Sequence, residues 1–286
     1  MQLSPTQIVI ISISFSVAII IALIWYYKDR NSDIAKNDES FSILMTIFFW
    51  SVAFSFVLKM ALDLLSYYNP GQIYNTMWFL IVSLFIEELV KIAALLMGVE
   101  LAGKLFNELS DGVIFTVFAA LGFIFLENIL YLVPFAEDVP SFLRVLAGRS
   151  IFTFAMHLFT VIFGVFYAIA YLRSDRLKHG HRVRPWQIGK QIKMLWKQFG
   201  LMLIFWLPMA PFVTIWKFSQ KGLKTITIPE VLWSGFLLSS YLHIGYDLLL
   251  ELQIPALSAF AFFVVIMFLG GLYLYFEHLD LKIQST

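Results

Sequence analysis

Stretches of about 20 consecutive apolar residues recur along nearly the whole chain of 286 residues. A helix of that length spans the roughly 30 Å hydrocarbon core of a bilayer, where the backbone finds no other hydrogen-bonding partners. Eight such stretches can be marked, at 7–27, 41–62, 77–98, 111–135, 149–172, 199–219, 229–250 and 254–276. We therefore predict an all-α, polytopic membrane protein with about eight transmembrane helices, and residues 1–286 as a single integral membrane domain.

The composition agrees with this class and excludes several others. The chain is 60% apolar and 14% charged, whereas soluble domains are typically 45–50% apolar and about 25% charged. The absence of cysteine excludes disulfides, thiolate metal ligands and a cysteine nucleophile. A net charge of +1 offers no basic field for nucleic acid, so the expected partners are the lipid bilayer and other membrane components.

Basic residues set the expected orientation through the positive-inside rule. With eight spans and the N-terminus outside, twelve lysines and arginines fall in inside segments and four in outside segments. Most of the twelve lie in 173–198, which we predict to be a basic cytoplasmic loop that fixes the topology. The alternative is that this segment is a binding site for anionic lipid headgroups. Both termini are expected outside, in the plasma membrane of a prokaryote.

Seven ionisable residues lie well inside predicted spans: Glu87, Glu88, Lys91, Glu127, His157, His243 and Asp247. A charged side chain at mid-bilayer costs on the order of 3 kcal/mol on insertion scales, so such residues are candidates for function. Seven separate burials would be very unfavourable unless the side chains face one another. We therefore expect one shared polar cluster in the bundle interior.

Helical spacing supports that convergence, because residues three or four apart share a face. This spacing joins Glu88 to Lys91, Glu127 to both Phe123 and Tyr131, and His243 to Asp247. Gly164 lies seven residues after His157, so a neighbouring helix is expected to approach closely there. Arg149 is expected to be an anchor at the membrane interface.

Buried carboxylates together with imidazoles suit the addition of water to a peptide carbonyl. A carboxylate can act as general base, and an imidazole can stabilise the oxyanion or bind a metal ion. The chain has neither the HExxH motif of zinc peptidases nor the GxSxG motif of serine hydrolases. Three alternatives stay open: a structural ion-pair cluster, a proton- or cation-coupled transporter, and a membrane protein that binds a partner without catalysis.

Four patterns on four predicted helices resemble those of the PrsW family of intramembrane proteases, relatives of the CAAX prenyl protease and Abi superfamily. They are EExxK at 87–91, FxxxExxxY at 123–131, His157 followed by Phe159, Thr160 and Gly164, and HxxxD at 243–247. The resemblance covers 77–250, which we take as the catalytic motif-bearing helices. It implies an endopeptidase that cleaves a membrane-anchored protein such as an anti-sigma factor.

The resemblance also implies roles for single residues. Glu87 would be the general base toward water, with Glu88 and Lys91 as its electrostatic partners. Glu127 would be a second acid, a water positioner or a ligand, and His157 would help to bind water or substrate. His243 would polarise the scissile carbonyl, oriented by Asp247, while Phe123 and Tyr131 support the second motif. The mechanism is glutamate-dependent or metal-dependent; a divalent metal such as zinc would be held by Glu127, His157 and His243.

Overall fold

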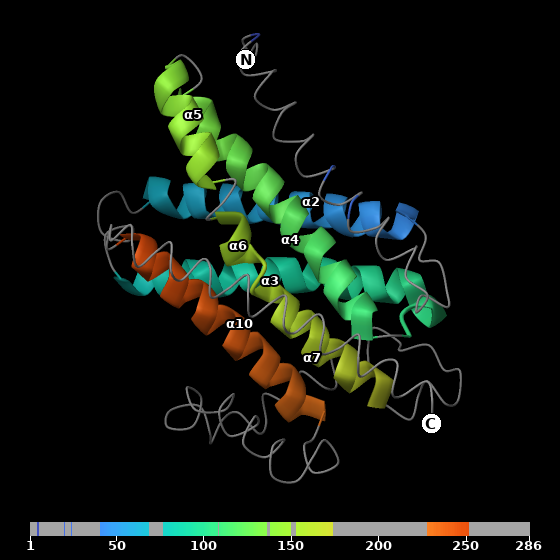
Figure 1. Cartoon of the computed structure of the whole chain (residues 1–286). Coiled ribbons are helices and arrows are strands. Elements are labelled where there is room, and N and C mark those ends of the chain that lie inside the picture. Colours follow the sequence, from blue (N-terminus) through green and yellow to red (C-terminus); the bar gives the residue numbers. More distant parts are fainter. Residues whose placement is uncertain are drawn as a thin grey trace.

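The computed structural model of the chain describes residues 41–68, 77–107, 109–135, 138–149, 153–173 and 228–251, apart from three isolated positions (Figure 1). Every regular element in these segments is helical, which confirms the all-α prediction for this part of the chain. The spans expected at 7–27, 199–219 and 254–276 lie outside the described residues. So do nearly all of the basic loop 173–198 and both termini, so the predicted topology stays a prediction.

Four of the predicted spans appear as long helices. They are α2 (Phe41–Tyr68), α3 (Met77–Ala102), α4 (Leu109–Leu132) and α10 (Ile228–Glu251). Short 3-10 turns follow α3 at Gly103–Leu105 and α4 at Val133–Phe135. Each helix begins within two residues of its predicted start, because the apolar run and the need for backbone hydrogen bonds act together.

The fifth predicted span, 149–172, is not one continuous helix. The chain forms α5 (Val139–Gly148), then α6 (Phe154–His157), and after a turn α7 (Thr160–Arg173). At the turn, the amides of Phe159, Val161 and Ile162 donate to carbonyls three residues earlier. No glycine or proline marks this break, because residues 149–163 contain neither. Contacts of His157 and Thr160 with other helices hold it instead.

Two of the described helical stretches are long and apolar enough to cross a membrane, Phe41–Leu64 and Leu109–Phe135. A third apolar stretch, Thr160–Tyr171, is shorter. Helix α3 carries three charged residues, Glu87, Glu88 and Lys91, in its middle and is not among these stretches. These findings support a membrane protein, and the number of eight spans stays a prediction.

Helix α4 forms the centre of the bundle. Seventeen of its 24 residues are buried, and it packs against α2, α3 and α7. Helix α10 lies along α7 and also contacts α3, so α3, α7 and α10 surround one interior region (Figure 1). The polar cluster predicted from the sequence lies in that region.

The close approach expected at Gly164 is confirmed. A Cβ atom on Gly164 would overlap the backbone carbonyl of Gly112 and the side chain of Thr116, both on α4. A Cβ on Gly112 would in turn overlap the carbonyl of Gly164. The two glycines therefore let the backbones of α4 and α7 meet directly.

We expect Gly164→Ala to destabilise the protein by about 1–3 kcal/mol, because a backbone carbonyl cannot move aside as a flexible side chain can. Thermal unfolding of the purified protein in lipid or detergent measures this. Gly245→Ala is the matched control, since a Cβ at that helical glycine meets nothing within 4 Å. Equal unfolding temperatures for the two variants would contradict the proposed crossing.

Candidate active site

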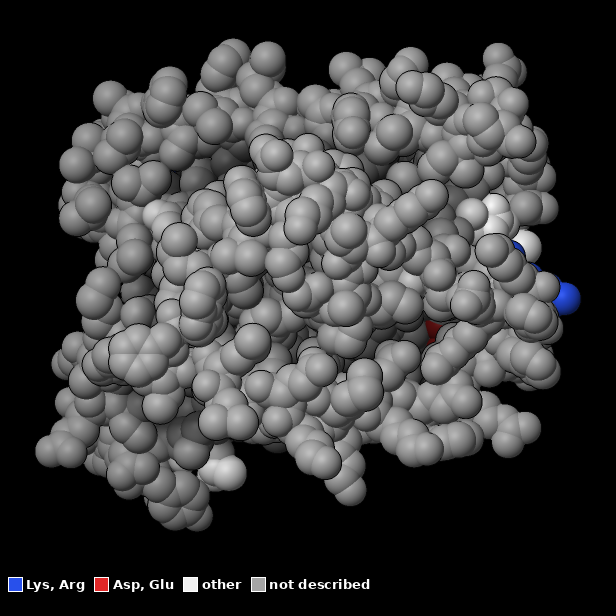
Figure 2. Space-filling view, turned by 90° about the horizontal axis from the view of Figure 1, so that it is seen from below, with Lys and Arg blue, Asp and Glu red and all other residues white. Residues whose placement is uncertain are grey.

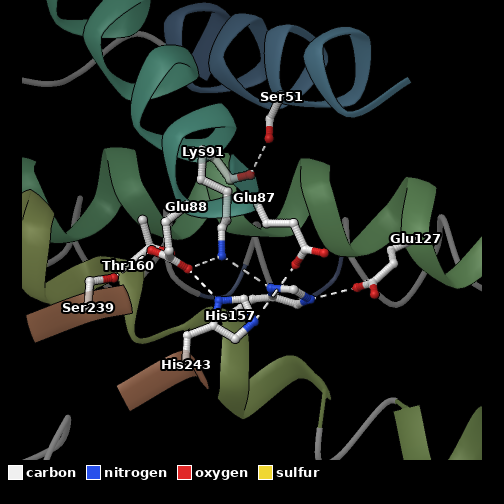
Figure 3. Close-up of polar contacts among 10 residues, drawn as sticks. Ser51, Glu87, Glu88, Lys91, Glu127, His157, Thr160, Ser239 and His243 are labelled. Atoms are coloured by element: carbon white, nitrogen blue, oxygen red, sulfur yellow. Dashed lines mark hydrogen bonds and ion pairs between the residues drawn. The ribbon is translucent and has the colours of Figure 1, made fainter. Parts of the chain in front are cut away.

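The predicted polar cluster exists and is enclosed by the bundle. The side chains of Glu88, Lys91, His157 and His243 are 0% exposed, and Glu87 retains 18% exposure (Figure 3). On the face seen in Figure 2, described charged groups show only as a basic group at one edge and a small recessed acidic area. The site is therefore inside the protein and not part of an open acidic surface on that face.

Glu88 on α3 has a partner for every lone pair of its carboxylate. Lys91 and the Nδ1 atom of His243, at 2.7 Å, contact Oε1. The hydroxyls of Thr160 and Ser239 donate to Oε2, at 2.8 and 2.5 Å. Glu88 thus joins α3, α7 and α10 through one carboxylate, and it has no free acceptor for water.

His243 presents one free nitrogen to the interior. Its Nδ1 faces a carboxylate, which only accepts hydrogen bonds, so Nδ1 carries the proton in the neutral ring. Its Nε2 therefore has a lone pair, is buried, and has no hydrogen-bond partner among the described residues. Oε2 of Glu87 lies 3.9 Å from that nitrogen.

The expected role of Asp247 in orienting His243 is wrong. The hydrogen bond to Nδ1 comes from Glu88 on the facing helix α3, and Nε2 faces Glu87. Spacing of four residues places Asp247 and His243 on one face of α10 but does not determine which partner the ring meets. The packing of α10 against α3 brings a carboxylate to the ring from across the interface.

His157 has partners on both ring nitrogens. Lys91 Nζ lies 3.2 Å from Nδ1, and Oε2 of Glu127 lies 2.6 Å from Nε2. An ammonium group only donates, so Nδ1 accepts and Nε2–H donates to Glu127. The ring of Phe123 packs against His157 at 4.9 Å between centroids. Phe123 therefore forms a wall of the site.

Glu127 lies behind His157 and extends the cluster to the end of α4. Its Oε1 atom forms an ion pair of 2.9 Å with Arg149. The Arg149 guanidinium also stacks on the ring of Tyr131 at 3.9 Å, and Tyr131 is 52% exposed. Tyr131 is thus at the margin of the site. The guanidinium of Arg149 faces Glu127, and the interface-anchor role expected for Arg149 stays a prediction.

The structure brings together a different set of possible metal ligands from the one expected. Glu87, His157 and His243 each offer a ligand atom, and these atoms lie within 4.8 Å of one another. The expected set had Glu127 in place of Glu87. Glu127 instead pairs with His157 and Arg149, so both of its oxygens have partners.

Sequence reasoning assigned no role to Thr160 or Ser239, and it did not predict that Arg149 faces Glu127. Thr160 comes three residues after His157, and Ser239 comes four residues before His243, so helical spacing was an available signal. Serine and threonine are frequent in membrane helices, which makes such spacing weak evidence alone. Their role as donors to Glu88 depends on how α7 and α10 face α3.

Two helices apolar enough to cross a membrane and a buried cluster of carboxylates, imidazoles and a lysine indicate a helical membrane protein with a polar site in the bundle interior. The model of the PrsW family of intramembrane metalloproteases matches residues 39–216, more than half of the chain. The chain belongs to this family of intramembrane proteases. The match includes the glutamates of α3 and ends before α10. The relation to the CAAX prenyl proteases stays a prediction.

One curated protein is similar over part of its length. Protease PrsW of Clostridioides difficile (strain 630) is 31% identical over 155 residues. The aligned part is 53% of this chain and 63% of that protein, so the chain spans less than two thirds of its relative. No solved structure matches the chain significantly.

Proposed function

We propose that the protein is an intramembrane endopeptidase that hydrolyses a peptide bond in a membrane-anchored protein, with water activated by Glu87. The observation that carries the proposal is the Glu87 carboxylate opposite the unpartnered Nε2 of His243. These are two free acceptors in a buried site, where the other acidic groups of the cluster have partners. Family membership supports hydrolysis.

The distance between these acceptors suits one water molecule. Two hydrogen bonds of about 2.8 Å that meet at one oxygen at roughly a right angle span about 4 Å. Glu87 Oε2 and His243 Nε2 are 3.9 Å apart. A water between them would donate one proton to each and keep its lone pairs free to attack a carbonyl carbon.

The reaction balances with the residues of this chain. Glu87 takes a proton from the water as the oxygen bonds to the scissile carbonyl carbon, giving a tetrahedral intermediate. The protonated Glu87 then gives this proton to the amide nitrogen as the C–N bond breaks. The products are a carboxylic acid and an amine. Lys91 supplies positive charge beside the developing oxyanion.

A metal ion fits part of this donor set. Two imidazoles and a carboxylate are typical zinc ligands, and the buried, unpartnered Nε2 of His243 with Glu87 offers free lone pairs. His157 offers one only where Lys91 or Glu127 moves aside. A bound divalent metal would act as a Lewis acid toward water and carbonyl. The residue set therefore allows both a glutamate-dependent and a metal-dependent enzyme.

The proposed substrate is a single-span membrane protein, with an anti-sigma factor or similar regulator as one candidate. A substrate anchored in the bilayer can reach a site built on membrane helices without leaving the lipid. We place the protein in the plasma membrane of a prokaryote with both termini outside. The alternatives are a proton- or cation-coupled transporter and a non-catalytic binding protein, and family membership favours the protease over both.

The test uses purified protein in lipid vesicles with a panel of single-span membrane proteins, and mass spectrometry of the products. We expect cleavage by the wild type and a loss of about 10²–10⁴-fold in His243→Asn, because the Asn amide still donates to Glu88 but has no Nε2 acceptor. Gly245→Ala on the same helix is the control. Cleavage by His243→Asn at the wild-type rate would contradict the site, and flux of protons or cations without cleavage would favour a transporter.

The same assay with a strong chelator separates the two mechanisms. Cleavage that survives the chelator supports direct activation of water by Glu87. Cleavage that is lost, and is restored by added zinc, supports a metal held by Glu87, His157 and His243.

A further inference from the structure

We propose that Arg149 is a positioning residue that acts through Glu127 to hold His157 in one orientation in the site. The inference rests on the proposed function for its kinetic test and has a spectroscopic test that is independent of activity. Arg149 does not contact Glu87, Glu88 or His243 through any described interaction; its effect would pass through a single carboxylate.

Residues at the end of α4 bind the Arg149 guanidinium. Its Nε donates to Oδ1 of Asn128 at 3.0 Å, and its Nη2 forms the ion pair with Glu127. The ring of Tyr131 covers its flat face at 3.9 Å. The Arg149 side chain is only 16% exposed. Arginine suits such a site because its planar fork can bind two acceptors while its face stacks on a ring.

Glu127 stands between Arg149 and His157, with one carboxylate oxygen for each. Oε1 faces Arg149 at 2.9 Å, and Oε2 accepts from His157 Nε2–H at 2.6 Å. The contact with Arg149 is an ion pair without the geometry of a directed hydrogen bond, so it holds the carboxylate mainly through charge. Charge on this carboxylate is also what attracts Nε2–H of His157.

The contacts continue from His157 to the centre of the site. With Nε2–H directed to Glu127, the Nδ1 lone pair of His157 faces Lys91, and Lys91 pairs with Glu88. If Glu127 turns, His157 loses the partner that sets its tautomer and orientation. Lys91 then loses one of its two polar contacts. Arg149 thereby influences the site over two intervening side chains.

Arg149 is also close to His157 along the chain. The test must therefore separate an effect transmitted through the backbone from one transmitted through Glu127. Arg149 directly follows α5, and α6 with His157 begins five residues later. Helix α5 packs on the end of α4 through Leu132 and Phe142. If Arg149 had a purely structural role, its side chain would anchor the connection between α5 and α6. The effect of replacing it would then not depend on the Glu127 carboxylate.

The kinetic experiment compares Arg149→Met, Glu127→Gln and the double variant with the wild type. We expect Arg149→Met to lower kcat about 10–100-fold with KM nearly unchanged, the usual effect of losing a group that orients another. The double variant should be no slower than Glu127→Gln alone, because Arg149 acts through that carboxylate. Arg149→Lys should recover part of the activity, since an ammonium can pair with Glu127 but not also reach Asn128. Arg144→Met, at an exposed position of α5, is the matched control.

A second readout needs no cleavage. Nitrogen NMR of histidine-labelled protein in lipid reports which ring nitrogen carries the proton, and His157→Gln assigns the signal. We expect the His157 signal to change in Arg149→Met and in Glu127→Gln, and to stay unchanged in Arg144→Met. The proposal would be overturned if the His157 signal stayed unchanged in Arg149→Met. It would also be overturned if the kinetic losses of the two single variants multiplied in the double variant, or if the loss of activity simply followed a loss of thermal stability. If no substrate of the panel is cleaved by the wild type, the proposed function fails, and the NMR result still decides this inference.

Discussion

Glu87→Gln is expected to lower the rate of peptide cleavage by about 10²–10⁴-fold, the usual contribution of a general base. The change keeps the size of the side chain and removes only its ability to take a proton from water. Among the described residues, Glu87 makes no ion pair shorter than the 3.9 Å between its Oε2 and His243 Nε2. The unfolding temperature should therefore stay close to that of the wild type. Initial rates on a cleaved substrate, together with thermal unfolding in the same lipid, measure both quantities.

Glu100→Gln is the matched control, because Glu100 lies on the same helix at an exposed position. It should leave both the rate and the unfolding temperature unchanged. A Glu87→Gln enzyme with the wild-type rate would show that another group activates the water.

Glu88→Ala is expected to destabilise the protein by about 3–5 kcal/mol, because it leaves a buried Lys91 without its counter-ion. Thr160, Ser239 and the Nδ1–H of His243 also lose their common acceptor. Cleavage should be lost together with the fold, which distinguishes this variant from Glu87→Gln. The measurement is the unfolding temperature and denaturant midpoint of the purified variant.

Removing both partners of the Glu88–Lys91 ion pair provides the control for the destabilisation expected in Glu88→Ala. Glu88→Ala with Lys91→Met leaves no uncompensated charge, so it should be more stable than Glu88→Ala alone. A Glu88→Ala variant that unfolds like the wild type would contradict the role of Glu88 as the anchor between α3, α7 and α10.

Adjacent glutamates on one helix therefore have different surroundings. Spacing alone leaves Glu87 and Glu88 equivalent, since both lie within a turn of Lys91. In the structure one carboxylate has four donors and the other faces a free imidazole nitrogen. The difference arises from a rotation of about 100° between consecutive side chains, which directs Glu88 into the α7–α10 interface.

The class of the protein and most members of the polar cluster could be predicted from the sequence. Long apolar runs allow only helices in a membrane, and the cost of burying isolated charges requires the ionisable residues to meet. Glu87, Glu88, Lys91, His157 and His243 do meet. The close helix contact at Gly164 was likewise predictable, because a side chain of one hydrogen leaves room for a backbone.

The pairing of these side chains, in contrast, depends on how the helices pack against one another. Spacing along one helix says which residues share a face, but the angle at which helices cross determines what that face meets. Hence His243 pairs with Glu88 and not Asp247, Glu127 pairs with Arg149, and the chain breaks between His157 and Thr160 without glycine or proline. Each outcome depends on contacts between residues distant in sequence, which no local pattern specifies.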